Sequence, residues 1–118
     1  MKSIPNTFNQ TGLTAVLTKR TGSTALYRLT NYYKDPCGYE IHRIRSRGQA
    51  LVRFKASGER PERVFVREES ERLAGPEDFG VWGWSAFTLE HADRIFELVD
   101  SGMSAAELRQ VLHSEKFA

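Results

Sequence analysis

Residues 80–100, GVWGWSAFTLEHADRIFELVD, pass directly from an aromatic strand pattern into an amphipathic helix pattern. Within residues 88–100 the apolar side chains recur at the spacing of one helical face, and the charged ones lie opposite. The apolar stripe consists of Leu89, Ala92, Ile95, Phe96 and Val99. Thr88 suits the position that caps the helix start, and Gly102 suits the position just past its end. The stretch therefore predicts a helix at residues 88–101 with one face to bury.

Upstream of this helix the chain reads as short strands, and downstream it reads as a second helix. Apolar, β-branched or aromatic runs separated by turn signals are typical of strands. They occupy residues 13–18, 24–31, 39–47, 51–56, 63–67 and 80–87, with turns at 21–23 and 35–38. Segments 51–56 and 63–67 are expected to pair as a hairpin arm. Ser104 and Glu107 form a capping-box pattern that predicts a helix at residues 104–115.

Strands first and helices last favour an α+β fold over a parallel sheet, because no βαβ alternation is present. We expect an antiparallel meander of about four to six strands with one or two C-terminal helices packed on one face. Residues 1–12 are expected to be an extended segment and residues 13–118 a single domain. The expected core residues are Leu26, Ile41, Val64, Trp84, Leu89, Ile95, Phe96 and Val99.

One strand departs from simple alternation. In residues 39–47 the apolar pair Ile41 and Ile44 is spaced by three, so regular alternation would place the two side chains on opposite faces. Either the strand is buried on both sides near its start, or a bulge near His42 and Arg43 resets the register.

Charge is divided by position along the chain. Residues 19–67 hold twelve basic and four acidic residues, a net charge of +8, whereas residues 68–118 hold four basic and eleven acidic ones, a net charge of −7. Such asymmetry favours a polyanionic partner. The opposite signs of the two parts also allow two copies to associate as a homodimer.

The basic residues of the predicted strands are the candidate binding residues. Arg43, Arg45 and Arg47 share a face if their strand is unbulged, and Arg53 and Lys55 share a face on a neighbouring segment. Arginine grips phosphate with two parallel hydrogen bonds and stacks on bases. Tyr32 and Tyr33 suit a single-stranded nucleic acid. The competing interpretation is a solvated sheet face, or one paired with acidic helix residues of the same chain.

Two further patterns leave alternatives open. Trp82 and Trp84 are either core residues or an exposed stacking or protein-binding pair. Residues 95–112 resemble the first two helices of a helix-turn-helix regulator, but the recognition helix that reads the major groove does not follow within the 118 residues.

Catalytic and metal-binding patterns are absent from the sequence. His42, His91 and His113 are scattered, and no nucleophile motif or phosphate loop occurs, so we expect no enzyme activity, no cofactor and no metal. Cys37, in a turn, is a candidate exposed thiol. No apolar run approaches the ~20 residues of a membrane helix, and no secretion signal begins the chain, which favours a cytoplasmic protein without a membrane partner.

Three motifs together resemble a known group of proteins. GYEIHRIR at residues 38–45, EDFG at 77–80 and AFTLEHA at 86–92 are similar to segments of small uncharacterised proteins carried by bacteriophages and conjugative elements. That group has no assigned activity. The resemblance implies a mobile-element context, in which small proteins bind nucleic acid or block a host protein. Nucleic acid is therefore the first expected partner, and a host protein is the alternative.

Overall fold

The computed structural model describes residues 3–47, 50–54, 58, 63–67 and 69–116. The chain divides into two compact units. The larger unit comprises Pro5–Ile44 and Leu73–Ala118, and the smaller comprises Met1–Ile4 and Arg45–Arg72. The sequence-based expectation of one domain over residues 13–118 did not distinguish them.

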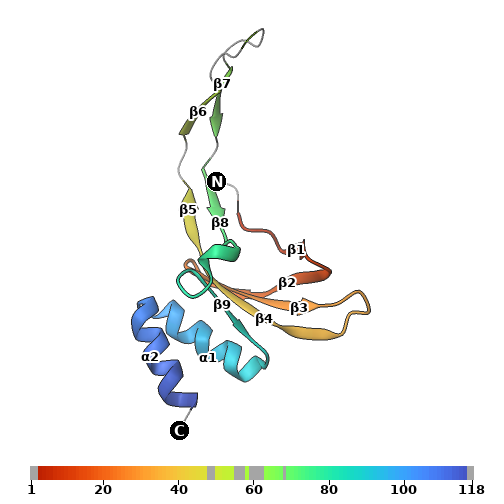
Figure 1. The fold of residues 1–118 in the computed structure, drawn as a ribbon, viewed down its shortest axis with the longest axis vertical. Helices are drawn as coiled ribbons and strands as arrows, with labels where there is room; N and C mark the ends of the chain where they lie inside the picture. The colour runs from red at the N-terminus through yellow and green to blue at the C-terminus, as the bar shows by residue number, and fades with distance from the viewer. Residues whose placement is uncertain (1–2, 48–49, 55–57, 59–62, 68, 117–118) are drawn as a thin grey trace. The chain divides into compact units, whose positions relative to one another are not determined.

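The larger unit is built on a five-stranded antiparallel sheet in the order β1-β2-β3-β4-β9 (Figure 1). Its strands are β1 Thr7–Gln10, β2 Leu13–Arg20, β3 Thr24–Thr30, β4 Pro36–Arg43 and β9 Gly83–Ala86. The first four form a meander, and the N-terminal segment contributes its edge strand. Gly83 is needed in β9, because a Cβ at this position would lie 2.9 Å from the Cβ of Ala74. The α+β fold class expected from the sequence is confirmed.

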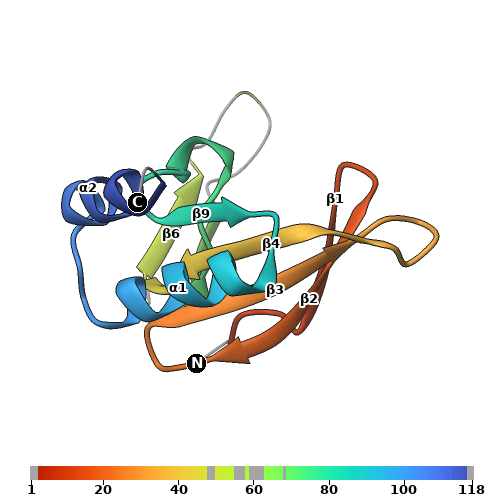
Figure 2. The same ribbon diagram turned by 90° about the horizontal axis from the view of Figure 1, so that it is seen from below.

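Two helices complete the larger unit, α1 at Leu89–Asp100 and α2 at Ala105–Lys116. Helix α1 lies across the face formed by β3, β4 and β9 (Figure 2). Both predicted caps are confirmed. The hydroxyl of Thr88 accepts a hydrogen bond from the main-chain N–H of His91 at 3.2 Å, and that of Ser104 accepts one from Glu107 at 3.2 Å.

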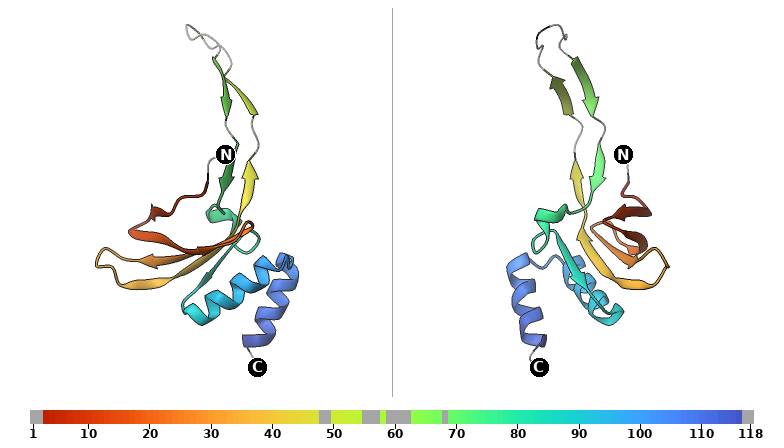
Figure 3. Two further views of the ribbon diagram at one scale, coloured as in Figure 1. Left: turned by 180° about the vertical axis from the view of Figure 1, so that it is seen from behind. Right: turned by 45° about the vertical axis from the view of Figure 1, so that its right-hand side comes forward.

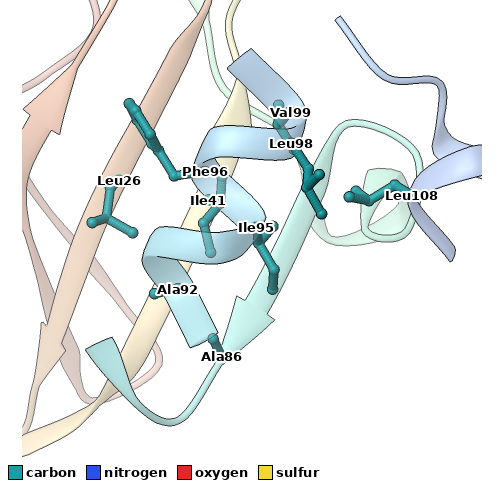
Figure 4. Close-up of a cluster of buried hydrophobic side chains, with 9 residues drawn as sticks. All are labelled: Leu26, Ile41, Ala86, Ala92, Ile95, Phe96, Leu98, Val99 and Leu108. Carbon is teal, nitrogen blue, oxygen red and sulfur yellow. The ribbon is translucent and has the colours of Figure 1, made fainter. Parts of the chain in front are cut away.

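The hydrophobic core lies between α1 and the sheet (Figure 4). Buried members of this cluster are Leu26, Ile41, Ala86, Ala92, Ile95, Phe96, Leu98, Val99 and Leu108. Two of the expected core residues lie outside this cluster. Leu89 is 51% exposed, because burial in α1 begins only at Ala92, and Val64 is 49% exposed in a two-stranded ladder of the smaller unit. Trp84 is partly buried and packs against the core.

Strand β4 resolves the irregular spacing of Ile41 and Ile44. Glu40, Ile41 and His42 are all buried, so both faces of the strand are covered. Of the two alternatives drawn from the sequence, burial on both sides is therefore the one observed. The predicted strand at residues 39–47 is nevertheless interrupted. β4 ends at Arg43, and the next strand begins only at Arg45.

The smaller unit consists of two antiparallel ladders (Figure 3). Strand β5, Arg45–Arg47, pairs with β8, Ser70–Arg72, and β6, Ala50–Phe54, pairs with β7, Arg63–Arg67. The second ladder confirms the predicted pairing of the two segments, with Val52 opposite Phe65.

Candidate nucleic-acid interface

The hairpin between β3 and β4 turns at residues 31–35, earlier than the predicted turn at 35–38, and Pro36 already belongs to β4. The side-chain oxygen of Asn31 accepts hydrogen bonds from the main-chain N–H groups of Tyr33 at 2.9 Å and Asp35 at 3.0 Å. Lys34 adopts the left-handed conformation, with φ +63°. The side chain of Asn31 thus stabilises the turn, in place of the Pro and Gly residues of the predicted turn at residues 35–38.

Tyr32 and Tyr33 occupy the tip of this hairpin. Their exposed fractions are 89% and 80%. The two rings contact each other edge to face, with centroids 5.4 Å apart and an interplanar angle of 87°. Each tyrosine therefore keeps most of its ring open to solvent while the other restricts its orientation.

A groove of about 320 Å³ begins at the hairpin tip and continues on to the sheet. The pairs Val16–Arg28 and Thr14–Thr30 are opposite each other in the β2–β3 register, so all four side chains share one face. The groove is lined by Thr14, Val16, Arg28, Thr30, Asn31, Tyr32 and Lys34. The described residues of this lining include two cations and no carboxylate.

Both cations of the groove are unengaged. Within the part of the chain that the structure describes, the side chains of Arg28 and Lys34 form neither an ion pair nor a hydrogen bond. Lys19, by contrast, pairs with Asp93 of α1 at 2.7 Å. The groove therefore presents two positive charges that an added anion can neutralise.

Arg43, a predicted binding residue, faces the helices instead. Its guanidinium donates hydrogen bonds to the carbonyl oxygen of Val99, at 3.5 Å, and to that of Met103. The same group lies 5.7 Å from the centroid of the Trp84 ring. It lies at the C-terminal end of α1, where the negative end of the helix dipole attracts a cation.

The other predicted basic residues fall in the smaller unit. Arg45 is partly buried in β5. Arg47 and Arg53 belong to β5 and β6, but their side chains lie outside the described residues, as does Lys55 entirely. The assumption that Arg43, Arg45 and Arg47 share one strand is wrong, because the ladder breaks at Ile44.

Of the seven predicted residues, only Tyr32 and Tyr33 are brought together by the described structure. Sequence reasoning missed their basic neighbours, Arg28 and Lys34. One signal was available for Arg28, which interrupts an otherwise apolar strand at residues 25–29.

A buried polar cluster occupies the sheet face opposite α1. Ala74 donates its main-chain N–H to Nδ1 of His42 at 3.2 Å, and Nε2 of His42 donates to Glu40 at 3.2 Å. Because Nδ1 accepts from Ala74, Nε2 is the ring nitrogen that donates to Glu40. Burial acts to raise the pKa of Glu40, but hydrogen bonds from His42 and Gln10 outweigh it and hold that pKa below its ordinary value.

This cluster has a structural role. The ring of His42 is packed edge to face between Tyr27, at 5.6 Å, and Phe79, at 5.7 Å. The ring is almost entirely buried and accepts the hydrogen bond from Ala74, while its partner Glu40 accepts a hydrogen bond from Gln10 of β1.

A second pocket, of about 560 Å³, lies between β9, α1 and α2. It is lined by Trp84, Ser85, His91, Ile95, Leu112, His113 and Glu115. Glu115 of this lining forms an ion pair with Arg94 of α1 at 2.7 Å. Phe87, at the corner between β9 and α1, is 91% exposed. Trp82, the other tryptophan of the predicted pair, is half-buried ahead of β9.

Other chemistries find little support among the residues that are described. They contain no group of three His, Cys, Asp or Glu side chains arranged to hold a metal ion. Cys37 is exposed, with its thiol 3.4 Å from the carbonyl oxygen of Asp35. No helix in the described ranges is long and apolar enough to span a membrane.

No protein-family model, curated protein or solved structure matches this chain.

Proposed function

We propose that the protein binds nucleic acid through the groove and hairpin tip of the larger unit, with contacts mainly to phosphate and little sequence specificity. One observation carries the proposal: Arg28 and Lys34, which have no partner among the described residues, line a groove to which no described carboxylate contributes, beside the exposed rings of Tyr32 and Tyr33. Basic side chains interleaved with stacking aromatics are the usual combination in proteins that bind single strands.

Among the described residues, no acidic side chain of the helices forms an ion pair with Arg28 or Lys34. In α1, Asp93 is paired with Lys19, and Glu97 lies 4.0 Å from Arg94. Helix α2 lies on the side of the unit away from the β3–β4 hairpin (Figure 2). The smaller unit, with nine basic and five acidic residues, carries +4 and adds a long-range attraction for polyanions.

The proposal is tested by titrating a fluorescently labelled 12-nucleotide strand at two salt concentrations and following its anisotropy. Neutralising two phosphates of a single strand gives a log–log salt slope of about −1.4. The variant Arg28→Ala/Lys34→Ala should weaken binding and reduce the magnitude of the wild-type slope by about that amount. Arg109→Ala, which removes an exposed cation on α2, is the matched control and should bind as the wild type does.

Absence of binding at low salt would refute the proposal. Weakening by Arg109→Ala of half that of the double variant or more would refute the location of the site, because the double variant removes two charges and Arg109→Ala one, so binding would then respond only to net charge.

Binding to a host protein is the second candidate function, and the pocket at β9 favours it. Phe87, which is almost fully exposed, follows Ser85 of the pocket lining by two residues, and exposed aromatic rings commonly anchor protein interfaces. Phe87→Asp should then abolish capture of a defined partner from nuclease-treated host lysate, whereas Tyr32→Ala should leave it intact. A partner that is captured from untreated lysate but not from nuclease-treated lysate would count against a host-protein partner.

A further inference from the structure

We infer that the hairpin-tip site is specific for single-stranded nucleic acid and stacks one unpaired base on the tyrosine tip, with the flanking phosphates held by Arg28 and Lys34. The inference rests on the proposed function and names the form of nucleic acid that the site takes. It is carried by the orientation of the two rings, by the rigidity of the turn and by the size of the groove.

The ring geometry limits the site to one base per ring face. Tyr32 and Tyr33 are nearly perpendicular, at 87°, so one flat base cannot stack on both. The edge of one tyrosine meets the face of the other, and this contact leaves an outer face open. In a duplex each base face is already covered by its neighbours, so only an unpaired strand can offer a base to that surface.

The turn fixes the main chain that carries the two rings before any ligand arrives. Asn31 accepts two main-chain hydrogen bonds, from Tyr33 and Asp35, and the main-chain N–H of Lys34 donates to the carbonyl oxygen of Asn31 at 2.9 Å. A loop fixed in this way loses little conformational freedom on binding, which favours affinity. The β3–β4 hairpin projects beyond α1 (Figure 2). The helix therefore does not obstruct a single-stranded nucleic acid that approaches the tip.

The groove admits a small group and not a double helix. Its volume of about 320 Å³ lies at the lower end of the range for small-molecule sites, roughly 300–1,000 Å³. Thr14 and Thr30 add hydroxyl groups to its lining, and Arg28 and Lys34 supply the charge. Such a lining suits the sugar and phosphate of one nucleotide adjacent to a stacked base.

The inference is tested with three probes of equal length: an eight-residue thymidine oligonucleotide, the same backbone without bases, and an eight-base-pair duplex. Stacking of one base should make the thymidine strand bind about 5- to 150-fold more tightly than the abasic strand, which carries the same phosphates. Tyr32→Ala/Tyr33→Ala should remove this preference, and Tyr32→Phe/Tyr33→Phe should keep it. Phe87→Ala, which removes another exposed aromatic ring, should leave it unchanged.

The outcomes separate the inference from the proposed function. Equal affinity for the thymidine and abasic strands, or tighter binding of the duplex, would overturn the inference and leave phosphate binding standing. Loss of preference in Phe87→Ala but not in the double tyrosine variant would also overturn it, by placing the stacking surface elsewhere. Failure of all three probes to bind at low salt would refute the proposed function itself. Thermal unfolding of each variant confirms that the exposed substitutions leave the fold intact.

Discussion

Arg43 of β4 donates a hydrogen bond to the carbonyl oxygen of Met103, just past the end of helix α1. The guanidinium also reaches the carbonyl oxygen of Val99, the penultimate residue of that helix. These contacts join the end of β4 to the C-terminal end of α1 and to the segment between α1 and α2. A cation that the strand pattern placed on a binding surface is therefore part of the packing between sheet and helices.

Replacing Arg43 should affect stability and leave nucleic-acid binding unchanged. Arg43→Ala leaves two carbonyl acceptors without their charged donor, which should lower the free energy of unfolding by about 1.5–3 kcal/mol. Urea unfolding measures this, with the exposed Arg109→Ala as the control that removes the same charge. A stable Arg43→Ala variant with weakened oligonucleotide binding would contradict this assignment.

Phe96 and Phe87 allow a buried and an exposed phenylalanine to be compared. Phe96 is buried against the sheet, with the ammonium group of Lys19 4.5 Å from its ring centroid, whereas Phe87 is exposed. Phe96→Ala should cost about 3–5 kcal/mol. Phe87→Ala should change stability by less than about 0.5 kcal/mol. Equal effects of the two substitutions in denaturant titrations would overturn the placement of α1 on the sheet.

Glu40 makes the stability of the fold sensitive to acid. Its pKa is below the ordinary value of 4.5, so its contribution is complete above that value and is lost as the pH falls through the lower pKa of the folded state. Between pH 5 and pH 3, wild type should lose stability more steeply than Glu40→Gln, which has no carboxylate to protonate. Chemical unfolding across that interval measures the two slopes, and parallel slopes would contradict the role of Glu40.

The fold could be predicted because the patterns that define its helices and their caps lie within short stretches of sequence. The stripe from Ala92 to Val99 has to be buried, and a strand lies directly before it. The caps at Thr88 and Ser104 depend on neighbours within three residues. Leu89 belongs to the same stripe, yet whether the first turn of a helix is covered depends on where the sheet lies beneath it, which is a tertiary property.

The candidate site was only partly predictable, for a related reason. Same-face spacing of Arg43, Arg45 and Arg47 holds only in an uninterrupted strand, and the break at Ile44 belongs to the division into two units. Arg28 and Lys34 are six positions apart in sequence. Their proximity depends on a turn at residues 31–35 that Asn31 sets, whereas the pattern of Pro and Gly favoured residues 35–38.

The most direct test of the central claim is an NMR titration of the ¹⁵N-labelled protein with the eight-residue thymidine oligonucleotide at low salt. Binding at this site should shift the amide signals of residues 14–16 and 28–34, around the groove and the hairpin tip, and leave those of α2 unchanged. Shifts concentrated in β9 and α2, or no shifts at all, would contradict the claim that the protein binds nucleic acid at this site.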